Sequence, residues 1–465
     1  PSKAAAVVCR NSGTCAAIPS LMLDEDMTNI PNPLTTGAPQ ESGFARFLRA
    51  TELDPSLLGR IGALLMIWIG FHLYGAIVLG EGLFLTPRNL WNLSVQTAYI
   101  GIMATGMVLI IIMREIDLSV GSIMGFVGVI MGLMQVNWLG AWLGLGHPAI
   151  WIITVLTGIA LGTLIGAFHG VLIAYLNIPS FIVTLGGMMV WRGAAFVASG
   201  STIAPMDETF KLFGGAGPFA AMGETGSWII AILACAAVLW MVKVSRGARA
   251  RHGFAPRPVW AESLVAGVSC AVILGSAAVV NAYPWAKGNL KIYFDNLKQP
   301  VPEDAVFGHG YAYPLLLLVA IVLIMTVLMS RTRFGRYVFA IGGNPEAAAL
   351  SGINTKAMKV TVFALMGGLS GIAAIVGAAR QDSATNAMGV FDELYVIAAA
   401  VIGGTSLAGG VGTVYGAIIG ALVLVSLQTG MVLIGFGDGS YQRMVTGVAL
   451  VLAVYLDIVY RKRIK

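Results

Sequence analysis

The chain has 465 residues, of which 57% are hydrophobic and only 11% are charged. Globular domains carry about 25% charged residues, so this composition excludes an ordinary soluble protein. The formal net charge is +6, and the distribution of cations described below accounts for it without a nucleic-acid partner.

Residues 1–59 form a polar stretch that we expect to be a disordered tail. Within it, residues 1–26 contain no apolar run long enough for a signal peptide, and the chain opens on Pro1. These residues are typical of upstream read-through or a processed remnant, whereas Met27 begins a more ordinary polar tail.

From residue 60 onward, apolar segments of about twenty residues follow one another, each suited to crossing a bilayer. Because lipid offers the backbone no hydrogen-bond partners, such segments form helices or a closed barrel, and runs this continuous favour helices. We predict an all-α polytopic integral membrane protein with about 10–12 transmembrane helices, some of them broken or half-length. Glycines interrupt the fifth segment and the pair at 394–435, which leaves open whether these cross. The expected spans are 61–79, 94–113, 119–138, 149–175, 181–199, 228–243, 263–283, 313–330, 358–379, 394–408, 412–435 and 441–460.

Lys and Arg concentrate on the cytoplasmic side of membrane proteins, which predicts the orientation. If the amino terminus starts inside, 18 cations fall at inner ends of the spans and 7 at outer ends. Both termini are therefore predicted to be cytoplasmic. The inner cations are Arg46, Arg49, Arg60, Arg114, Lys243, Arg246, Arg249, Arg251, Arg257, Arg331, Arg333, Arg336, Lys356, Lys359, Arg461, Lys462, Arg463 and Lys465, and the outer ones are Arg88, Lys211, Lys287, Lys291, Lys298, Arg380 and Arg443.

Charged residues interrupt the apolar sequence at REIDLSVGS, residues 114–122. Each charge left at mid-membrane would cost roughly 2.5–3.5 kcal/mol. The chain is therefore expected either to make a tight interfacial turn, with Arg114 paired to Glu115 or Asp117, or to line a transport pathway here. Asp117 or Ser119 can cap the helix that follows.

Arg192 lies deep in the apolar segment 181–193. If this segment crosses the bilayer, the side chain either snorkels outward or faces a cavity. Gly186 and Gly187 could break the helix to form such a cavity.

A short helix with the caps typical of solvent-exposed helices is predicted within GGNPEAAALSGIN, residues 342–354. Asn344 suits the N-cap, Pro345 the first helical position and Glu346 the positive end of the helix dipole, and Gly352 can end the helix. Because a helix of barely two turns is marginal alone in water, something else is expected to hold it.

Signatures of catalysis are missing from the sequence. No GxxxxGK[ST] motif occurs, so we expect the chain not to hydrolyse ATP itself, and no catalytic residue is proposed. Gly410, Gly412 and Gly416 imitate a dinucleotide-binding fingerprint, but the spacing of Gly412, Gly416 and Gly420 fits close packing of membrane helices better. The 4 cysteines and 5 histidines are scattered, which predicts no disulfide, metal site or cofactor.

Several motifs, in order along the chain, resemble one family. They are EIDLSVGS at 115–122, IPSFIVTLGG at 178–187 with WRG at 191–193, RTRFGRY at 331–337, GGNPEAAALSGI at 342–353 and GGTSLAGGVGT at 403–413. They look like the inner-membrane permease subunits of bacterial ABC importers for simple sugars. The likeness is to the D-xylose type above all, with ribose, galactose and arabinose permeases as relatives, and it runs from about residue 60 to the carboxyl terminus.

The resemblance implies a division of the chain and a set of partners. After the tail at 1–59 come a first transmembrane half at 60–243, an extra cytoplasmic segment, span and periplasmic loop at 244–312, and a second transmembrane half at 313–465. The partners are a cytoplasmic ABC ATPase subunit, a periplasmic sugar-binding protein and a second permease copy in a homodimer, in the bacterial inner membrane.

The resemblance also implies which residues carry the function. In such importers a short cytoplasmic helix of the permease fits a groove on the ATPase, here at 344–352. The expected coupling residues are Asn344, Pro345, Glu346, Ala349, Leu350 and Gly352. Because a neutral sugar needs hydroxyl and amide partners, the candidate pathway residues are Asp117, Ser119, Ser122, Asn177, Thr184 and Arg192, although Ser and Thr also bond helix backbones in any membrane bundle.

The competing class is an ion-coupled secondary transporter, which would also be polytopic. Such a protein normally needs Asp, Glu or His well inside its spans. The acidic residues of this sequence cluster at the predicted span ends, which favours the importer. They are Glu115, Asp117, Asp382, Asp392, Glu393 and Asp457.

Overall fold

A computed structural model describes residues 8–9, 15–16, 43–200, 202–215, 217 and 219–464. The chain divides into two compact units, residues 1–52 and 53–465. In the first unit, the described elements are strands β1 (Val8–Cys9) and β2 (Cys15–Ala16), which pair antiparallel, and helix α1 (Gly43–Thr51).

Helix α1 contradicts the expectation of a disordered tail for the residues that it contains. Its sequence GFARFLRAT is amphipathic, with Phe47 and Leu48 half-buried and Arg46 and Arg49 exposed. Apolar side chains at helical spacing give the segment a face to bury, which a wholly polar tail lacks. Apart from the strand residues, positions 1–26 lie outside the described part of the chain.

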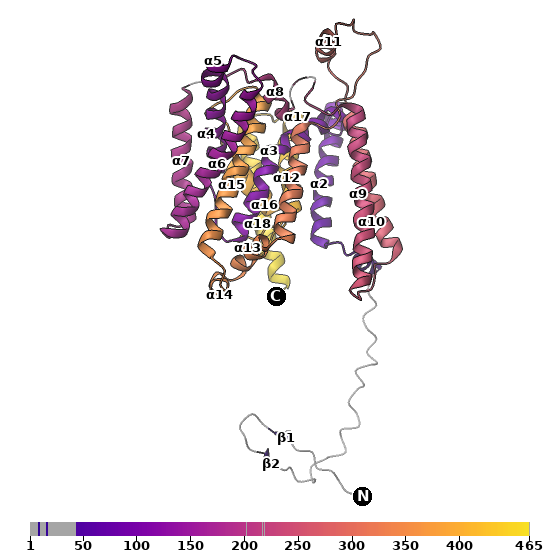
Figure 1. The fold of residues 1–465 in the computed structure, drawn as a ribbon. Coiled ribbons are helices and arrows are strands. Elements are labelled where there is room, and N and C mark those ends of the chain that lie inside the picture. The colour runs from indigo at the N-terminus through magenta and orange to yellow at the C-terminus, as the bar shows by residue number, and fades with distance from the viewer. Residues whose placement is uncertain are drawn as a thin grey trace. The chain divides into compact units, whose positions relative to one another are not determined.

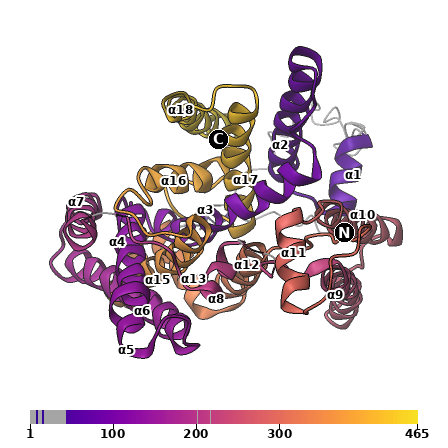
Figure 2. The ribbon, with the colours of Figure 1, turned by 90° about the horizontal axis from the view of Figure 1, so that it is seen from above.

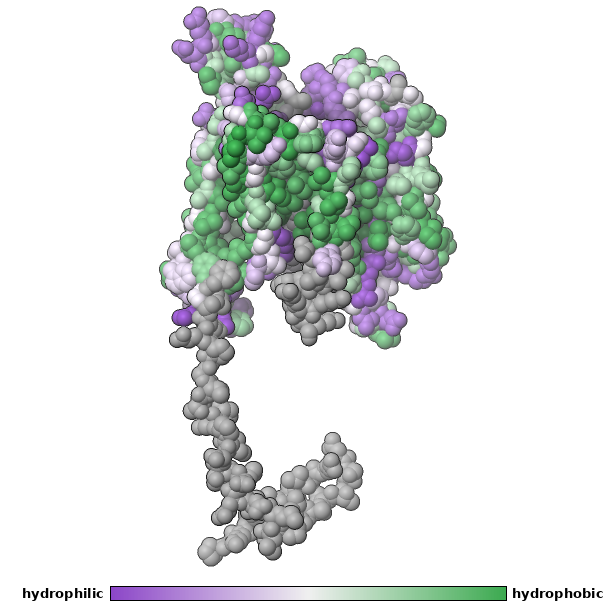
Figure 3. All heavy atoms as spheres, turned by 180° about the vertical axis from the view of Figure 1, so that it is seen from behind, coloured by the Kyte–Doolittle hydropathy of each residue, from purple (hydrophilic) through white to green (hydrophobic). Residues whose placement is uncertain are grey.

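The second unit is helical, which confirms the predicted all-α class (Figure 1). Its visible side chains are hydrophobic along the middle of the helices and hydrophilic at both ends (Figure 3). Among the described residues, 10 stretches of helix are long and apolar enough to cross a membrane. The helices are α2 (Pro55–Tyr74) with η2 (Gly75–Leu79), α3 (Pro87–Ile112), α4 (Val120–Leu133) with η3 (Met134–Trp138) and α5 (Leu139–Leu143), α6 (Ala149–Tyr175), α7 (Ser180–Ser199), α8 (Glu208–Lys211) with η4 (Leu212–Gly214), α9 (Gly223–Arg251), α10 (Val259–Asn281), α11 (Lys287–Asn296), α12 (Tyr313–Arg331), α13 (Arg333–Gly343), α14 (Pro345–Leu350), α15 (Thr355–Gln381), α16 (Asp392–Ile402), α17 (Val414–Leu433) and α18 (Gly439–Ile464).

Two of the expected spans need comment. The fifth, interrupted by Gly186 and Gly187, is the continuous helix α7, so these glycines do not break it. Whether the segment 394–408 crosses was left open by its glycines, and α16 is too short to cross, because it has 11 residues and ends at Ile402, before Gly403 and Gly404. At 1.5 Å per residue such a helix covers about 16 Å, roughly half of a hydrocarbon core about 30 Å thick.

Helices α3, α4 and α15 form the interior of the second unit. Within their most apolar stretches, 89%, 72% and 83% of the residues are buried, compared with 11% in α2 and α9. Seen from above, α3 and α15 lie among the other helices, whereas α7 and the α9–α10 pair lie at the margins (Figure 2). Side chains at the margins face an apolar solvent, so their exposure is not a defect.

A row of glycines joins α6 and α15. A Cβ added at Gly166 would collide with the carbonyl oxygen of Phe363, and one at Gly367 would collide with that of Gly162. With no side chains between them, the two backbones touch directly, as small-xxx-small spacing allows. The same packing, predicted for Gly412, Gly416 and Gly420, is confirmed for the two on α17, where the neighbours of Gly416 and Gly420 are the carbonyl oxygens of Gly403 and Ala399. Gly412 precedes α17 and meets side chains of Thr405 and Ile112 instead.

The segment 382–402 crosses the second unit in two halves. After α15 ends, residues 382–391, which we call the cavity loop, turn back into the interior, where Gly389 touches the backbone of Gly121. Helix α16 then continues to Gly403, whose carbonyl oxygen accepts a hydrogen bond from the guanidinium of Arg60. The cavity loop, which is irregular, and the half-length helix α16 thus take the place of the missing span. Membrane proteins tolerate such irregular backbone around a cavity.

Candidate functional site

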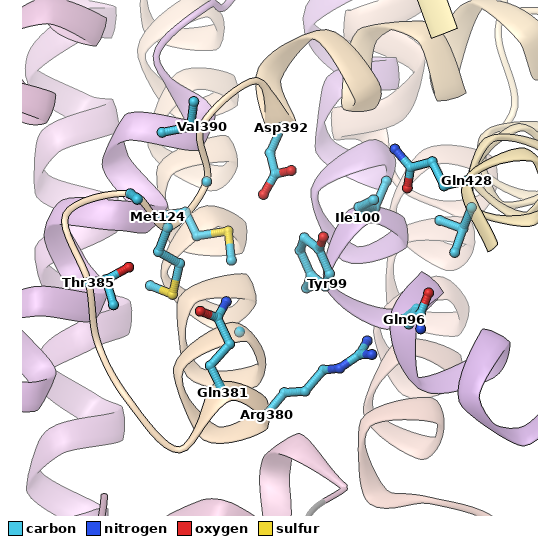
Figure 4. Close-up of a pocket in the computed structure, with 15 residues that line it drawn as sticks. Gln96, Tyr99, Ile100, Met124, Arg380, Gln381, Thr385, Val390, Asp392 and Gln428 are labelled. Atoms are coloured by element: carbon cyan, nitrogen blue, oxygen red, sulfur yellow. The ribbon is translucent and has the colours of Figure 1, made fainter. Parts of the chain in front are cut away.

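A cavity of about 460 Å³ lies among α3, α4, α15, the cavity loop, α16 and α17 (Figure 4). Figure 4 shows Tyr99, Gln381 and Asp392 turned toward the same space. The lining residues are Gln96, Tyr99, Ile100, Met124, Gly377, Arg380, Gln381, Thr385, Ala387, Met388, Gly389, Val390, Asp392, Val425 and Gln428.

The lining mixes two kinds of surface. Amides, a phenol, a hydroxyl and one charge of each sign offer hydrogen-bond donors and acceptors, and methionine and aliphatic side chains supply apolar contact. Gln96 is partly engaged, since its Oε1 accepts from Thr429 Oγ1 at 3.1 Å. Such a cavity suits a small polar molecule that carries many hydroxyl groups on an apolar carbon frame.

Arg192 holds the cavity loop from behind. Its Nη1 donates to the carbonyl oxygens of Asn386 at 3.1 Å and Met388 at 2.7 Å, and its Nη2 to that of Gly389 at 3.0 Å. The guanidinium therefore points into the protein instead of snorkelling outward, and it supports the cavity wall without lining the cavity.

In the turn between α3 and α4, Arg114 does not form the expected ion pair with Glu115 or Asp117. Arg114 has φ 64° and donates to the carbonyl oxygens of Gly342 and Gly343, at 2.8 and 2.6 Å. Glu115 instead pairs with Lys359, at 2.5 Å. Ser119 occupies the N-cap of α4 but makes no side-chain cap bond, since its hydroxyl and its N–H both donate to Asp117 Oδ1.

Asp117 and Ser119 continue into a buried polar chain. Ser119 Oγ lies 3.2 Å from His169 Nδ1 on α6, and Trp191 Nε1 on α7 donates to His169 Nε2 at 3.1 Å. Asp117, Ser119 and His169 are no more than 2% exposed. Trp191 therefore connects these buried polar residues to α7, the helix whose Arg192 holds the cavity loop.

The other pathway candidates lie elsewhere. Ser122 donates to the carbonyl oxygen of Ser119 at 2.7 Å, and Thr184 to that of Ser180 at 2.8 Å, so both hydroxyls bond the backbone. Asn177 is exposed at the turn between α6 and α7, with φ 53°. None of the six candidates is among the residues that line the cavity.

Sequence reasoning missed the residues that do line the cavity. Gln96 and Gln428 are amides inside otherwise apolar spans, a signal that could have marked them. Arg380 was assigned to a membrane border because it ends a predicted span, and the inward turn of the cavity loop after it has no local signature.

Two acidic residues lie deeper than expected. Asp392 and Glu393 are 8% and 6% exposed, at the N-terminus of α16 inside the second unit. Glu393 Oε2 has no hydrogen-bond partner among the described residues. The premise that the acidic residues sit at span ends is therefore wrong for this pair, and their position does not separate an importer from an ion-coupled transporter.

The predicted short helix is present as α14, and we call residues 344–352 the knob. Asn344 Oδ1 accepts from the N–H groups of Glu346 and Ala347 at 3.0 and 3.1 Å, and Gly352 has φ 86°. Leu350 is 89% exposed, whereas Ala348 is buried and anchors the knob. Pro345 and Ala349 are also exposed.

Helices that can cross a bilayer, a polar cavity among the most buried of them and a capped protruding helix are together the features of a membrane permease. The chain matches the family described as "Branched-chain amino acid transport system / permease component" over residues 89–249 and 261–454. It belongs to this family of transport-system permeases.

Three relatives illustrate the similarity. The xylose transport system permease protein XylH of Escherichia coli strain K12 is 34% identical over 93% of this chain and 98% of its own length. The protein of the same name in Haemophilus influenzae is 34% identical over 82% and 92% of the two chains. The ribose import permease protein RbsC of Escherichia coli strain K12 is 31% identical over 80% and 87%. No solved structure matches the chain.

Proposed function

We propose that this protein is the permease subunit of an ABC importer that carries a monosaccharide, D-xylose or a related sugar, into the bacterial cell. The observation that carries the proposal is the 34% identity to a xylose permease over 93% of this chain and 98% of that protein. The family description names branched-chain amino acids instead, so the choice of substrate is open to direct test.

The cavity is the proposed passage for the sugar. Gln96, Gln428 and Tyr99 would bond hydroxyl groups, and Met124 and Met388 would contact the C–H faces of the ring. Asp392, across from these amides, would accept strong charge-assisted hydrogen bonds from hydroxyl groups. Weak contacts of this kind suit a molecule that must also leave.

The knob is the proposed contact with the ATPase. Leu350 and Ala349 present an exposed apolar patch beside the acidic Glu346, and a helix this short gains stability from a partner that buries it. ATP would act only by its different affinity for the two arrangements of the complex, so the knob needs to transmit motion and no chemistry.

Membrane orientation and partners complete the proposal. The excess of Lys and Arg around the knob, including Arg114, Lys356 and Lys359, supports a cytoplasmic location for the knob and for both termini. A sugar-binding protein would deliver its ligand at the opposite end, and two permease copies would share two ATPase subunits.

Uptake into proteoliposomes tests the proposal. The permease is purified with a candidate ABC ATPase and a candidate sugar-binding protein, and radiolabelled D-xylose uptake is measured with and without internal ATP. We expect ATP-dependent uptake that unlabelled pentoses compete for and leucine does not. Competition by leucine would make the substrate an amino acid, and uptake by the permease alone on a sodium or proton gradient would make it a secondary transporter.

A further inference from the structure

We propose that α7 is a strut that links the knob to the cavity loop through an unbroken series of polar contacts, with the Trp191 to His169 hydrogen bond as its central link. The proposal rests on the proposed function, because it describes how a push on the knob would reach the sugar cavity. It assigns Trp191, His169 and Arg192 as positioning residues that touch no sugar themselves.

The first step runs from the knob to the turn at 113–119. Arg114 donates to the carbonyl oxygens of Gly342 and Gly343, immediately before the knob, and Glu115 pairs with Lys359, in the first turns of α15 after the knob. The Glu115 and Lys359 side chains are 13% and 29% exposed, so the pair is partly shielded from water. The turn at 113–119 is therefore bonded to the residues just before the knob and to the helix just after it.

The second step runs from the turn to α7. At the start of this helix, Ser180 Oγ accepts from the N–H of Ile116 at 3.3 Å, and Thr184 Oγ1 lies 3.3 Å from the carbonyl oxygen of Ile116. Further along, the buried chain from Asp117 through Ser119 and His169 reaches Trp191. Two separate attachments fix both the position and the rotation of α7.

The protons of the buried chain can be placed from its chemistry. An indole N–H only donates, so His169 Nε2 is the acceptor and a neutral His169 carries its proton on Nδ1. Nδ1–H then donates to Ser119 Oγ, whose own proton goes to Asp117. Each hydrogen bond then has one donor and one acceptor, and removal of any member leaves a buried neighbour without its partner.

The third step runs from α7 to the cavity. Arg192 follows Trp191 directly and donates to three carbonyl oxygens of the cavity loop, those of Asn386, Met388 and Gly389. Met388 and Gly389 line the cavity. A shift of α7 along its axis would therefore displace the cavity wall.

The packing of α7 suits a moving part. Only 22% of its most apolar stretch is buried, compared with 83% for α15, and it lies at the margin of the second unit (Figure 2). Helix α7 packs mainly on α4, where Trp191 lies beside Phe126, so its polar attachments to other elements help to decide where it sits.

Trp191→Phe is the diagnostic variant, because it removes one N–H donor and keeps an aromatic ring. Trp68→Phe is its matched control, since Trp68 Nε1 donates to Ser426 Oγ at 2.8 Å, an inter-helix bond that is no part of the series. In proteoliposomes we expect Trp191→Phe to lower the sugar carried per ATP hydrolysed by about fivefold, and Trp68→Phe to leave this ratio unchanged. An unchanged ratio in Trp191→Phe would overturn the proposal.

Arg192→Gln should lower the ratio similarly, and the double variant should be no worse than the worse single one, since both break the same series. Effects that multiply would show two independent roles and contradict the strut.

Hydrogen exchange of the purified full chain gives a readout that needs no transport. We expect Trp191→Phe and Glu115→Gln each to speed exchange of the amides at 386–390, and Trp68→Phe not to. If the wild-type complex carries no sugar with ATP, the proposed function fails, while this measurement still decides the strut. Unchanged exchange at 386–390 in both variants would sink it.

Discussion

Gly166 on α6 lies so close to Phe363 on α15 that a Cβ at position 166 would overlap the carbonyl oxygen of Phe363. Gly186 on α7 offers the opposite environment, with nothing within 4 Å of an added Cβ. The two glycines make a matched pair for testing how much the contact between α6 and α15 contributes to stability.

We expect Gly166→Ala to destabilise the protein by about 1–3 kcal/mol, because overpacking forces the two backbones apart. Gly186→Ala should be neutral or slightly stabilising, since alanine is the better helix former. Thermal unfolding in detergent measures both. Equal melting temperatures for the two variants would contradict the close packing.

The knob predicts a loss of coupling without a loss of folding. Glu346→Lys combined with Leu350→Lys reverses a charge and places another on the exposed apolar patch, so ATPase binding, ATPase stimulation and transport should all be abolished. Both side chains are exposed, and the permease should remain inserted and monodisperse.

The control for the knob variant lies at the other end of the protein. Glu303 and Val306 are exposed residues of the segment between α11 and α12, and Glu303→Lys with Val306→Lys makes the same chemical change. This variant should still co-purify with the ATPase. Normal ATPase binding by the knob variant would leave α14 an ordinary loop helix.

The cavity predicts a selective effect of one hydroxyl. Tyr99 and Tyr395 are both half-buried, but only Tyr99 lines the cavity. Tyr99→Phe should weaken sugar transport by a factor of about 3–10, the effect of one hydrogen bond worth roughly 0.5–1.5 kcal/mol. Tyr395→Phe should transport normally, and kinetics over a range of sugar concentrations compare the two. Equal kinetics for both variants would remove Tyr99 from the passage.

The ion pair between Lys211 and Asp382, at the start of the cavity loop, is expected to contribute to the stability of the protein. They lie 3.1 Å apart, and Asp382 Oδ1 also accepts from the N–H of Met206 at 2.9 Å. Burial opposes the charge on Lys211, but bonds to Glu208 and Asp382 outweigh it and raise the Lys211 pKa. The stabilisation is therefore complete below the ordinary lysine pKa and is lost only as the pH rises through the higher folded value.

Asp382→Asn keeps an acceptor for Met206 and removes the charge, so we expect it to cost no more than about 1 kcal/mol. Asp382→Ala removes both and should cost about 1 kcal/mol more. Melting temperatures at neutral pH separate the two contributions. An equal loss in Asn and in Ala would show that the bond to Met206 contributes nothing and that the charge accounts for the whole effect.

Structural features that depend only on residues close together in the sequence were predictable. The caps of the knob, at Asn344 and Gly352, follow local rules, and the long spans follow from apolar length. Half-length helices were expected, but the end of α16 at Ile402 could not be placed, because the apolar residues around Ile402 look the same whether the chain ends a helix there or continues across the membrane.

The cavity and its support depend on contacts between distant segments. Arg192 meets carbonyl oxygens nearly two hundred positions later in the chain, and backbone acceptors leave no trace in residue identity. His169 looked like one of several scattered histidines, since its partners come from the α3–α4 turn and from α7. Sequence patterns found the residue types but could not bring them together.

The glycine row between α6 and α15 has a mechanical consequence. At these glycines the two backbones touch with no side chain between them that could change rotamer, so the contact favours movement of the two helices as one rigid body. Since α15 begins at Thr355, just after the knob, α6 and α15 together would form the rigid centre about which the rest of the subunit moves. Inward and outward opening would then be turns of the thinly packed outer helices around it.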